Sequence, residues 1–383
     1  MKIGIDCRLF GKKHAGIGRY IENLVVRLPY FLPNHDFVYF FHDKGQLAEL
    51  MKLLGQIDLP KTLSVQEFFE KVQIVYAPIK HYTLKEQREM PKIFETHHLD
   101  LLHVPHFNAP IFYKGKMCIT IFDLLWHEYK GGAVTTLSPI AYRVKYLAYK
   151  LVTAQAVKKA LVIFYSAQVV KKSILKYYPK VKNKLVLTQY GVTLPLASKV
   201  RPSLIKQLPQ QPYLLYVGSL YPHKNIKIVL EAMTKNQKLL LVCVGSRNVF
   251  QDRIKAQVEK LDLKNRVFFL GYVADEELSY LYQHCQALVQ PSLSEGFGLT
   301  GVEAMGVGAP VLASDIPIFK EIYGEAAFIF DPHNSNSFLT TLNNLEKTNR
   351  QKIIEQGKKQ ASKYNWDDMI KTVVQTYEKL LAK

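Results

Sequence analysis

The chain has 383 residues, more than one hydrophobic core usually supports, so we expect two domains. With 48% hydrophobic and 22% charged residues, the composition excludes an intrinsically disordered protein. The cysteines have no paired Cys-x-x-Cys spacing, which predicts buried thiols in a reducing cytosol and argues against a zinc site. They are Cys7, Cys118, Cys243 and Cys285. No run is long enough to span a bilayer and no signal-peptide core is present, so we expect a cytoplasmic protein.

The net charge of +19 is concentrated in one part of the chain. Between Glu128 and Glu231 there are seventeen Lys and Arg and no Asp or Glu, which leaves +2 for the rest. A block with charge of one sign indicates a surface that binds phosphates, either those of nucleic acid or those of an anionic membrane.

Short apolar runs alternate with helical patterns in the first half of the chain. This alternation predicts a parallel sheet covered on both faces. Ligands of such sheets bind at the carboxyl ends of the strands, so the loops that follow them are candidate sites. The expected strands are Ile3–Asp6, Phe37–Phe41, Gln73–Tyr76, Leu101–Val104, Cys118–Phe122 and Leu161–Tyr165.

The loop after the first strand contains Gly16 and Gly18 and leads into a helix that we expect to begin at Tyr20. It lacks a third glycine at position 21, so it fails the dinucleotide-binding fingerprint. Its backbone can approach a phosphate or an acceptor at a helix N-terminus, but a plain tight turn fits the pattern equally well.

Polar side chains follow two later strands. His106 and Asn108 lie in a proline-bounded loop after Leu101–Val104, which makes them candidate acceptor-binding residues. Asp123 directly follows the strand that ends at Phe122. This carboxylate either orients an acceptor hydroxyl during the reaction or caps the following turn, and the sequence favours neither.

From Leu137 to Val170 the chain is basic and aromatic. Its tyrosines fall at helical spacing, as in a basic amphipathic helix at a membrane interface. A helix that packs its tyrosines into the domain has the same spacing. The missing acidic residues favour contact of the region 130–227 with an anionic membrane surface or an anionic acceptor. We do not expect nucleic acid as a partner, because no recognised binding module is present. The tyrosines are Tyr142, Tyr146 and Tyr149.

A proline-rich stretch with little periodicity, Thr193–Pro212, predicts a linker. We therefore expect an N-terminal domain of residues 1–193 and a C-terminal domain of residues 194–364. The strand pattern then resumes. The expected strands of the second domain are Tyr213–Gly218, Leu239–Val244, Val267–Leu270, Ala287–Val289 and Val311–Ala313. Lys224 precedes the helix expected at Ile226–Met233, where its ammonium group can neutralise a diphosphate.

The stretch Pro291–Met305 carries the strongest functional signal. A short buried strand precedes it and a helix is expected from Thr300. The backbone N–H groups of Gly298, Leu299 and Thr300 are therefore free to bind an anion. Glycine at 298 also removes the Cβ atom that would hold a phosphate away.

Two carboxylates accompany this anion site. Glu295 lies in the loop, where it can accept hydrogen bonds from sugar hydroxyls. Glu303 lies about one turn into the helix and suits a neutral diol such as ribose. The combination predicts a nucleotide-diphosphate-sugar site, although glycine-containing turns and surface glutamates are common in α/β proteins.

The sequence Pro-Ser-x-x-Glu-Gly-Phe-Gly-Leu, followed by Glu303, resembles the signature of retaining glycosyltransferase family 4, which has the GT-B fold. The resemblance implies an α/β protein with two Rossmann-like, doubly wound parallel-sheet domains that face a cleft. It also implies a C-terminal helix, residues 365–383, that packs back on the first domain. In that family the glutamate equivalent to Glu295 contacts the donor sugar and the one equivalent to Glu303 contacts the ribose.

Further donor residues follow from the resemblance. It places Gly16 and Gly18 near the donor phosphates, Gly218 in the donor site and Val273 near the nucleobase. Phe122 departs from the family, because relatives have histidine there, and a phenyl ring cannot transfer protons. His223 stands where relatives have arginine, which removes a bidentate phosphate ligand.

We therefore expect a retaining hexosyltransferase that uses a nucleotide-sugar such as GDP-mannose or UDP-glucose. Its acceptor would be a saccharide or a lipid-linked sugar in polysaccharide or glycolipid biosynthesis. The expected catalytic residues are Lys224, Glu295 and Asp123. No Asp-x-Asp signature is present and the family resemblance implies metal independence, so we expect no metal and no cofactor. We expect a peripheral location on the inner face of the membrane. The alternatives are a GT-B epimerase or phosphorylase, or a non-catalytic assembly subunit that binds nucleotide or membrane.

Overall fold

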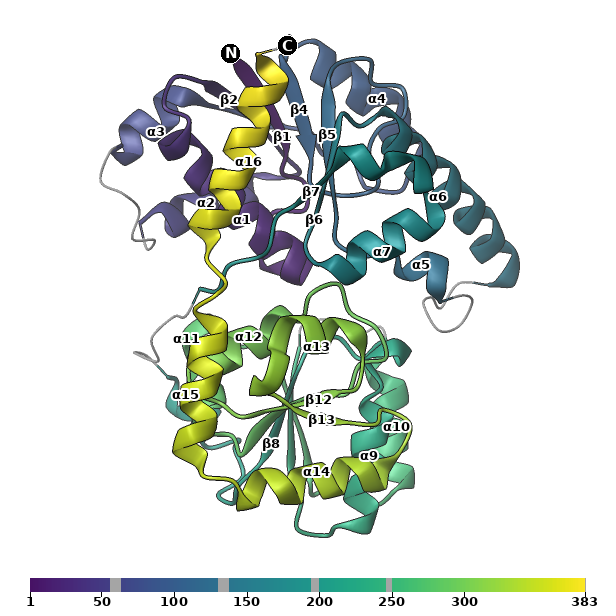
Figure 1. Cartoon of the computed structure of the whole chain (residues 1–383), viewed down its shortest axis with the longest axis vertical. Helices are drawn as coiled ribbons and strands as arrows, with labels where there is room; N and C mark the ends of the chain where they lie inside the picture. The colour runs from purple at the N-terminus through teal and green to yellow at the C-terminus, as the bar shows by residue number, and fades with distance from the viewer. Residues whose placement is uncertain (56–62, 130–137, 194–199, 246–249, 383) are drawn as a thin grey trace. The chain divides into compact units, whose positions relative to one another are not determined.

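The computed structural model describes residues 1–55, 63–129, 138–193, 200–245 and 250–382. The chain divides into two compact units, which are described separately here (Figure 1). The first unit consists of Met1–Leu124, Ser138–Gly191 and Asn365–Lys383, and the second contains Val192–Tyr364. A short stretch that begins at Leu125 also groups with the second unit, whereas the sequence placed it in the first.

The first unit is built on a seven-stranded parallel sheet in the order β3-β2-β1-β4-β5-β6-β7. The chain moves outward from β1 to β3 and then returns to β4 on the other side of β1. The carboxyl ends of β1 and β4 therefore form a topological switch point, where ligands of such sheets bind. The strands are β1 (Lys2–Asp6), β2 (Asp36–Phe41), β3 (Val72–Tyr76), β4 (Leu101–Val104), β5 (Met117–Ile121), β6 (Val162–Tyr165) and β7 (Leu185–Leu187).

Helices cover both faces of this sheet. Several begin at side-chain caps, as at Ser64, Thr83 and Asn365, which accept hydrogen bonds from backbone N–H groups of the first turn. The helices are η1 (Lys12–His14), α1 (Ala15–Phe31), α2 (Lys44–Leu54), α3 (Val65–Lys71), α4 (Leu84–Glu95), α6 (Pro139–Lys159), α7 (Gln168–Tyr177), η3 (Pro179–Lys184) and α16 (Trp366–Leu381). In the described part of the chain, no helix combines the length and the apolar character needed to cross a membrane.

The second unit has a six-stranded parallel sheet in the order β10-β9-β8-β11-β12-β13. Here the switch point lies between β8 and β11. The strands are β8 (Leu214–Val217), β9 (Leu241–Val244), β10 (Val267–Gly271), β11 (Ala287–Gln290), β12 (Val311–Ser314) and β13 (Phe328–Phe330). Buried aliphatic side chains of β8, β9 and β11 pack against α9 and α14 to form the core of the unit.

The helices grouped with the second unit include several short ones near strand ends. They are α5 (Leu125–Glu128), α8 (Pro202–Ile205), η4 (Pro222–Lys224), α9 (Ile226–Lys235), α10 (Gln251–Lys260), α11 (Asp275–His284), α12 (Leu299–Gly306), α13 (Pro317–Tyr323), η5 (Gly324–Ala326), α14 (Ser335–Lys347) and α15 (Arg350–Ala361). The expected linker, Thr193–Pro212, contains α8. Arg201, which directly precedes α8, forms an ion pair with Glu277. Residues 194–199 of that linker lie outside the described residues.

The C-terminal helix α16 packs back on the first unit, as the family resemblance implied (Figure 1). Arg27 of α1 holds Asp367 with its Nε at 2.9 Å from Oδ1. His103 of β4 is bonded through Nδ1 to the hydroxyl of Tyr377 at 2.6 Å. Trp366 is buried beside Tyr190, with the ring centroids 5.9 Å apart. The first unit otherwise ends at Gly191, so α16 completes its core from the C-terminal end of the chain.

The helix expected to begin at Tyr20 begins five residues earlier, at Ala15. Gly16 and Gly18 therefore lie in the first turn of α1 rather than in a loop before it. The two glycines differ in their surroundings. A Cβ atom on Gly18 would lie 2.0 Å from the carbonyl oxygen of Gly11, whereas one on Gly16 would meet nothing within 4 Å.

We therefore expect Gly18→Ala to destabilise the protein by about 1–3 kcal/mol, because the backbone of Gly11 must move. Gly16→Ala is the matched control and should be neutral or stabilising by up to about 1 kcal/mol, since alanine is the better helix former. Urea denaturation of both variants at neutral pH measures the difference. Equal stability of the two variants would contradict this packing.

Candidate functional site

The carboxyl ends of β8 and β11 bring two charged side chains together. Lys224 is the last residue of η4, which follows β8, and Glu295 lies in the loop between β11 and α12. The Nζ atom of Lys224 lies 2.6 Å from Oε1 of Glu295, and the hydroxyl of Ser292 donates to the same oxygen at 2.7 Å. Both charged side chains are mostly shielded from solvent. Two of the three expected catalytic residues are thus in direct contact at the switch point.

Backbone contacts fix the loops that carry this pair. The N–H of Leu293 donates to the carbonyl oxygen of His223 at 2.7 Å. Asn225 adopts a left-handed conformation, with φ of 53°, and its side chain donates to Pro332 at 2.8 Å. Burial, and then the charge of Lys224, lower the pKa of His223 to about 4. His223 is therefore neutral at pH 7 and adds no charge where relatives have arginine.

The N-terminus of α12 lies against Tyr323 of α13. Gly298 precedes the helix with φ of 90°, and its carbonyl oxygen accepts a hydrogen bond from the Tyr323 hydroxyl at 2.7 Å. Cβ atoms on Gly298 and Gly301 would lie 2.4 and 2.2 Å from that hydroxyl. Leu299 and Thr300 are the first two residues of α12. Both glycines are therefore required by the packing against Tyr323. Neither Tyr323 nor Gly301 was expected from the sequence.

Glu303 is the fifth residue of α12 and is 5% exposed. A carboxylate is seldom so deeply buried in a protein unless polar groups surround it. Its position places it on the same helix as the N–H groups of the predicted anion site, one turn further in. That Glu303 stands beside the anion rather than on it stays a prediction.

Glycines end three neighbouring strands of the second unit and line a pocket. They are Gly218 after β8, Gly245 after β9 and Gly271 at the end of β10. A Cβ atom on Gly245 would lie 2.3 Å from the carbonyl oxygen of Gly218, so the two backbones pack directly. Tyr216 also lines the pocket, and its pKa is raised by burial and then by the charge of Glu295. The pocket is therefore close to the Lys224–Glu295 pair.

Val273 follows β10 and is 5% exposed, and it does not line this pocket. Gly218 does, together with Gly245 and Gly271, which were not among the candidate residues. The signal for them was present, because each glycine directly ends an expected strand at the edge where ligands bind.

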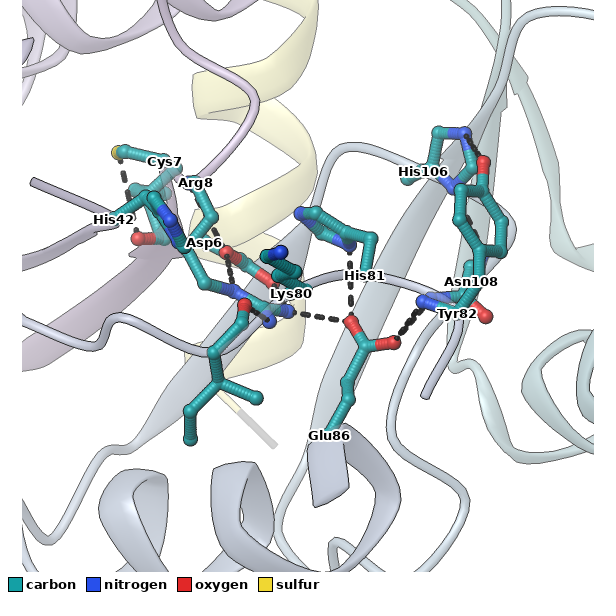
Figure 2. A network of polar contacts seen from close by, with 12 residues as sticks. Asp6, Cys7, Arg8, His42, Lys80, His81, Tyr82, Glu86, His106 and Asn108 are labelled. Atoms are coloured by element: carbon teal, nitrogen blue, oxygen red, sulfur yellow. Dashed lines mark hydrogen bonds and ion pairs between the residues drawn. The ribbon is translucent and has the colours of Figure 1, made fainter. Parts of the chain in front are cut away.

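A second polar cluster lies at the switch point of the first unit (Figure 2). Its centre is the buried guanidinium of Arg8, just after β1. Arg8 donates through Nε and Nη2 to the two carboxylate oxygens of Asp6, at 2.9 and 2.7 Å. Nη2 also donates to Oε1 of Glu86 at 2.8 Å, and Nη1 donates to the carbonyl oxygen of Ile79 at 3.0 Å. One buried cation thus neutralises two buried carboxylates from β1 and α4.

The cluster extends to both predicted acceptor residues in the β4 loop (Figure 2). Asn108 donates from Nδ2 to Oε2 of Glu86 at 2.7 Å, and its backbone N–H donates to Nδ1 of His106 at 3.0 Å. Burial, followed by the charge of His81, lowers the pKa of His106 to about 3, so its ring is neutral. Because Nδ1 accepts, Nε2 carries the proton and faces the Tyr82 hydroxyl at 3.3 Å. His106 is thus held in one tautomer beside an exposed tyrosine.

The two carboxylates of the cluster remain ionised. Burial alone would raise the pKa of Asp6, but the charge and hydrogen bonds of Arg8 outweigh it and lower the pKa. Burial alone would likewise raise the pKa of Glu86, but His81, Arg8 and Asn108 outweigh it and lower the pKa. Nδ1 of His81 lies 2.9 Å from Oε1 of Glu86. Neither Arg8 nor Glu86 was expected in a site from the sequence.

Asp123 follows β5 in the first unit. Its charge contributes, after burial, to raising the pKa of both Tyr149 and Tyr190, so it lies near these rings. The preceding Phe122 is 7% exposed and packs edge-on against Tyr20, with the ring centroids 5.1 Å apart. The position where relatives have histidine is therefore part of an aromatic core here. Within the described residues, no group of three or more His, Cys, Asp or Glu side chains is placed to hold a metal ion.

Two units built on parallel sheets, with the last helix of the chain returned to the first unit, are the architecture of the GT-B fold. The solved structure of Anabaena Alr3699/HepE in complex with UDP-glucose has this fold, with a TM-score of 0.71 and 18% identity over 99% of this chain and 100% of that one. Residues 203–360 match the family described as glycosyl transferases group 1, which supports the resemblance to a glycosyltransferase predicted from the sequence.

Two curated relatives match part of the chain. The O-antigen chain mannosyltransferase B of Escherichia coli is 33% identical over 181 residues, which are 45% of this chain and 48% of the relative. The O-antigen chain mannosyltransferase RfbU of Salmonella typhimurium is 34% identical over 170 residues, which are 43% of this chain and 46% of the relative. The matched segments therefore span about half the length of these relatives.

Proposed function

We propose that the protein is a retaining glycosyltransferase that moves a hexose from a nucleotide-diphosphate-sugar to a hydroxyl of a saccharide or lipid-linked acceptor. The contact between Lys224 and Glu295, beside the N-terminus of α12, carries this proposal. It lies in the unit that matches the glycosyl transferases group 1 family. An ammonium group, free helix N–H groups and a carboxylate are the groups needed to bind a diphosphate and a sugar together.

Cleavage of the bond between the sugar and the phosphate builds negative charge on the departing diphosphate. Lys224 and the N–H groups of Gly298, Leu299 and Thr300 stabilise that charge, because they are already oriented before the reaction. Glu295 accepts hydrogen bonds from the sugar hydroxyls and holds Lys224 in place through its 2.6 Å contact. Glu303 accepts from the ribose hydroxyls, and the glycine-lined pocket receives the nucleoside.

In this proposal the acceptor binds to the first unit, and the candidate residues are His106, Asn108 and Asp123. No histidine stands at Phe122 to take the acceptor proton. We propose that an oxygen of the donor phosphate accepts it, so that the acceptor oxygen forms the new bond as the bond to the diphosphate breaks. Transfer then needs no divalent metal ion.

The relatives support a sugar of the mannose or glucose type. Two of them are named as O-antigen chain mannosyltransferases, and the structural neighbour HepE is in complex with UDP-glucose. We therefore propose GDP-mannose or UDP-glucose as donor, and a role in polysaccharide biosynthesis at the cytoplasmic face of a membrane. The basic region 130–227 is the proposed membrane-facing part, although its Lys130 and Lys199 lie outside the described residues.

A panel of nucleotide-sugars, each with and without EDTA, tests the proposal by the release of nucleoside diphosphate. We expect release from one nucleotide class only, unchanged by EDTA, and an increase of the KM for donor of about tenfold in Glu303→Ala, which loses one charge-assisted hydrogen bond. Release from no donor, with or without a mixture of saccharide and lipid-linked acceptors, would contradict transfer. An altered sugar without any acceptor would instead identify an epimerase.

A further inference from the structure

Helix α6 exposes a continuous stripe of large aliphatic side chains. Ile140, Val144, Leu147 and Leu151 are 77%, 64%, 67% and 56% exposed. Their spacing of four, three and four residues places them on one face of the helix. Single exposed aliphatic side chains are ordinary on protein surfaces, but four of them on one face over about three turns of a helix are not.

The opposite face of α6 is already packed into the first unit. Tyr149 and Thr153 are buried there, and Tyr149 meets the ring of Phe107 edge-on at 5.2 Å. Tyr142 and Tyr146 are half-buried on the same side. The tyrosines therefore pack into the domain, which is one of the two interpretations of their spacing in the sequence. The helix also has a second apolar face, which is exposed to solvent. Figure 1 shows α6 at the outer side of its unit.

Basic side chains flank the aliphatic stripe. Arg143 and Lys150, seven residues apart, are exposed along one side of it, and Lys145 is exposed on the other. The next helix in the chain, α7, also contains Lys171, Lys172 and Lys176, and no acidic residue occurs from 129 to 230. An occupant of this face must accept aliphatic side chains at its centre and positive charge around them.

We propose that the outer face of α6 docks on an anionic lipid bilayer, with the four aliphatic side chains in the interface and the basic residues at the headgroups. A second copy of this chain is a poor occupant, because its own Arg143, Lys145 and Lys150 would be brought against the same charges. A nucleic acid would leave the aliphatic side chains against phosphates. This docking rests on and deepens the membrane-facing role proposed for the region 130–227, but it can fail while sugar transfer stands, since docking is measured without donor or acceptor.

A fluorescent label at the centre of the stripe tests the docking directly. The four native cysteines are buried, so the thiol of Leu147→Cys can be labelled selectively with a polarity-sensitive fluorophore. With vesicles of phosphatidylcholine and phosphatidylglycerol we expect a blue shift of its emission, and a weaker one without phosphatidylglycerol. Met51→Cys, at a 55% exposed position of α2, is the matched control and should show no shift.

A sedimentation assay adds a second readout. The double variant Ile140→Gln/Leu147→Gln should bind the anionic vesicles at least about tenfold more weakly, with an unchanged circular dichroism spectrum, because both side chains are exposed in the folded protein. Met51→Gln should bind as the wild type does. Equal shifts at both labels, wild-type binding by the double variant, or a blue shift without vesicles together with dimer formation would each overturn the proposal.

Discussion

Lys224→Met is expected to lower kcat for sugar transfer at least about hundredfold, with a smaller effect on donor affinity. The contact with Glu295, at 2.6 Å, holds the ammonium group of Lys224 near the N-terminus of α12. In the proposed reaction it is therefore already in place when negative charge develops on the departing diphosphate. Removal of one preorganised donor to a developing negative charge typically costs about 10²–10³ in kcat. Steady-state kinetics with the donor identified in the panel, at saturating acceptor, measures the effect.

Lys227→Met provides the matched control. Lys227 is three residues further along the chain, in the first turn of α9, and its ammonium group makes only an exposed contact with Glu231 at 3.5 Å. We expect its kcat to stay within about twofold of the wild type, since such surface pairs contribute little. Equal losses in the two variants would mean that Lys224 acts only through net charge, and no loss in Lys224→Met would remove it from the reaction.

Arg8→Met is expected to destabilise the protein by about 3–5 kcal/mol, because it leaves the carboxylates of Asp6 and Glu86 buried without their cation. The loss should be smaller in the double variant Arg8→Met/Glu86→Gln, which removes one of the two unpaired charges. Lys85→Met is the control on the same helix as Glu86, since Lys85 is exposed and 3.7 Å from Glu89. It should change the free energy of unfolding by no more than about 0.5 kcal/mol.

Urea denaturation at pH 7 measures all three variants. If Arg8→Met unfolds at the same urea concentration as Lys85→Met, the cluster contributes nothing to stability. If Arg8→Met/Glu86→Gln is less stable than Arg8→Met, the destabilisation does not come from unpaired charge. Either outcome would contradict the account of the cluster given above.

The parallel sheets could be predicted because their central strands are buried on both faces and stand out as apolar runs. Two of the four edge strands could not be predicted. β7 (Leu185–Leu187) and β13 (Phe328–Phe330) have three residues each and are half-buried for most of their length, so neither produces a recognisable run. The start of α1 at Ala15 was missed because no capping side chain marks it.

The candidate residues of the second unit could be grouped from the sequence because they lie close together in it, from Glu295 to Glu303, or at a helix start, as with Lys224. Tyr323 could not, since it reaches Gly298 and Gly301 from another helix and only the fold brings it there.

In the first unit, His106 and Asn108 were found from their place after a strand, but the buried ion cluster that holds Asn108 was not. Arg8 and Glu86 are 78 residues apart and meet only when β1 and α4 pack together. A hint was present in the two-residue spacing of Asp6 and Arg8 at the end of the first strand, which suits a bidentate pair.

A crystal structure of the full chain with a bound nucleoside diphosphate tests the central claim most directly. We predict phosphate oxygens within hydrogen-bond distance of Lys224 Nζ and of the first N–H groups of α12, with the ribose hydroxyls on Glu303. A nucleotide ordered elsewhere in the protein, away from residues 295–303, would contradict the account.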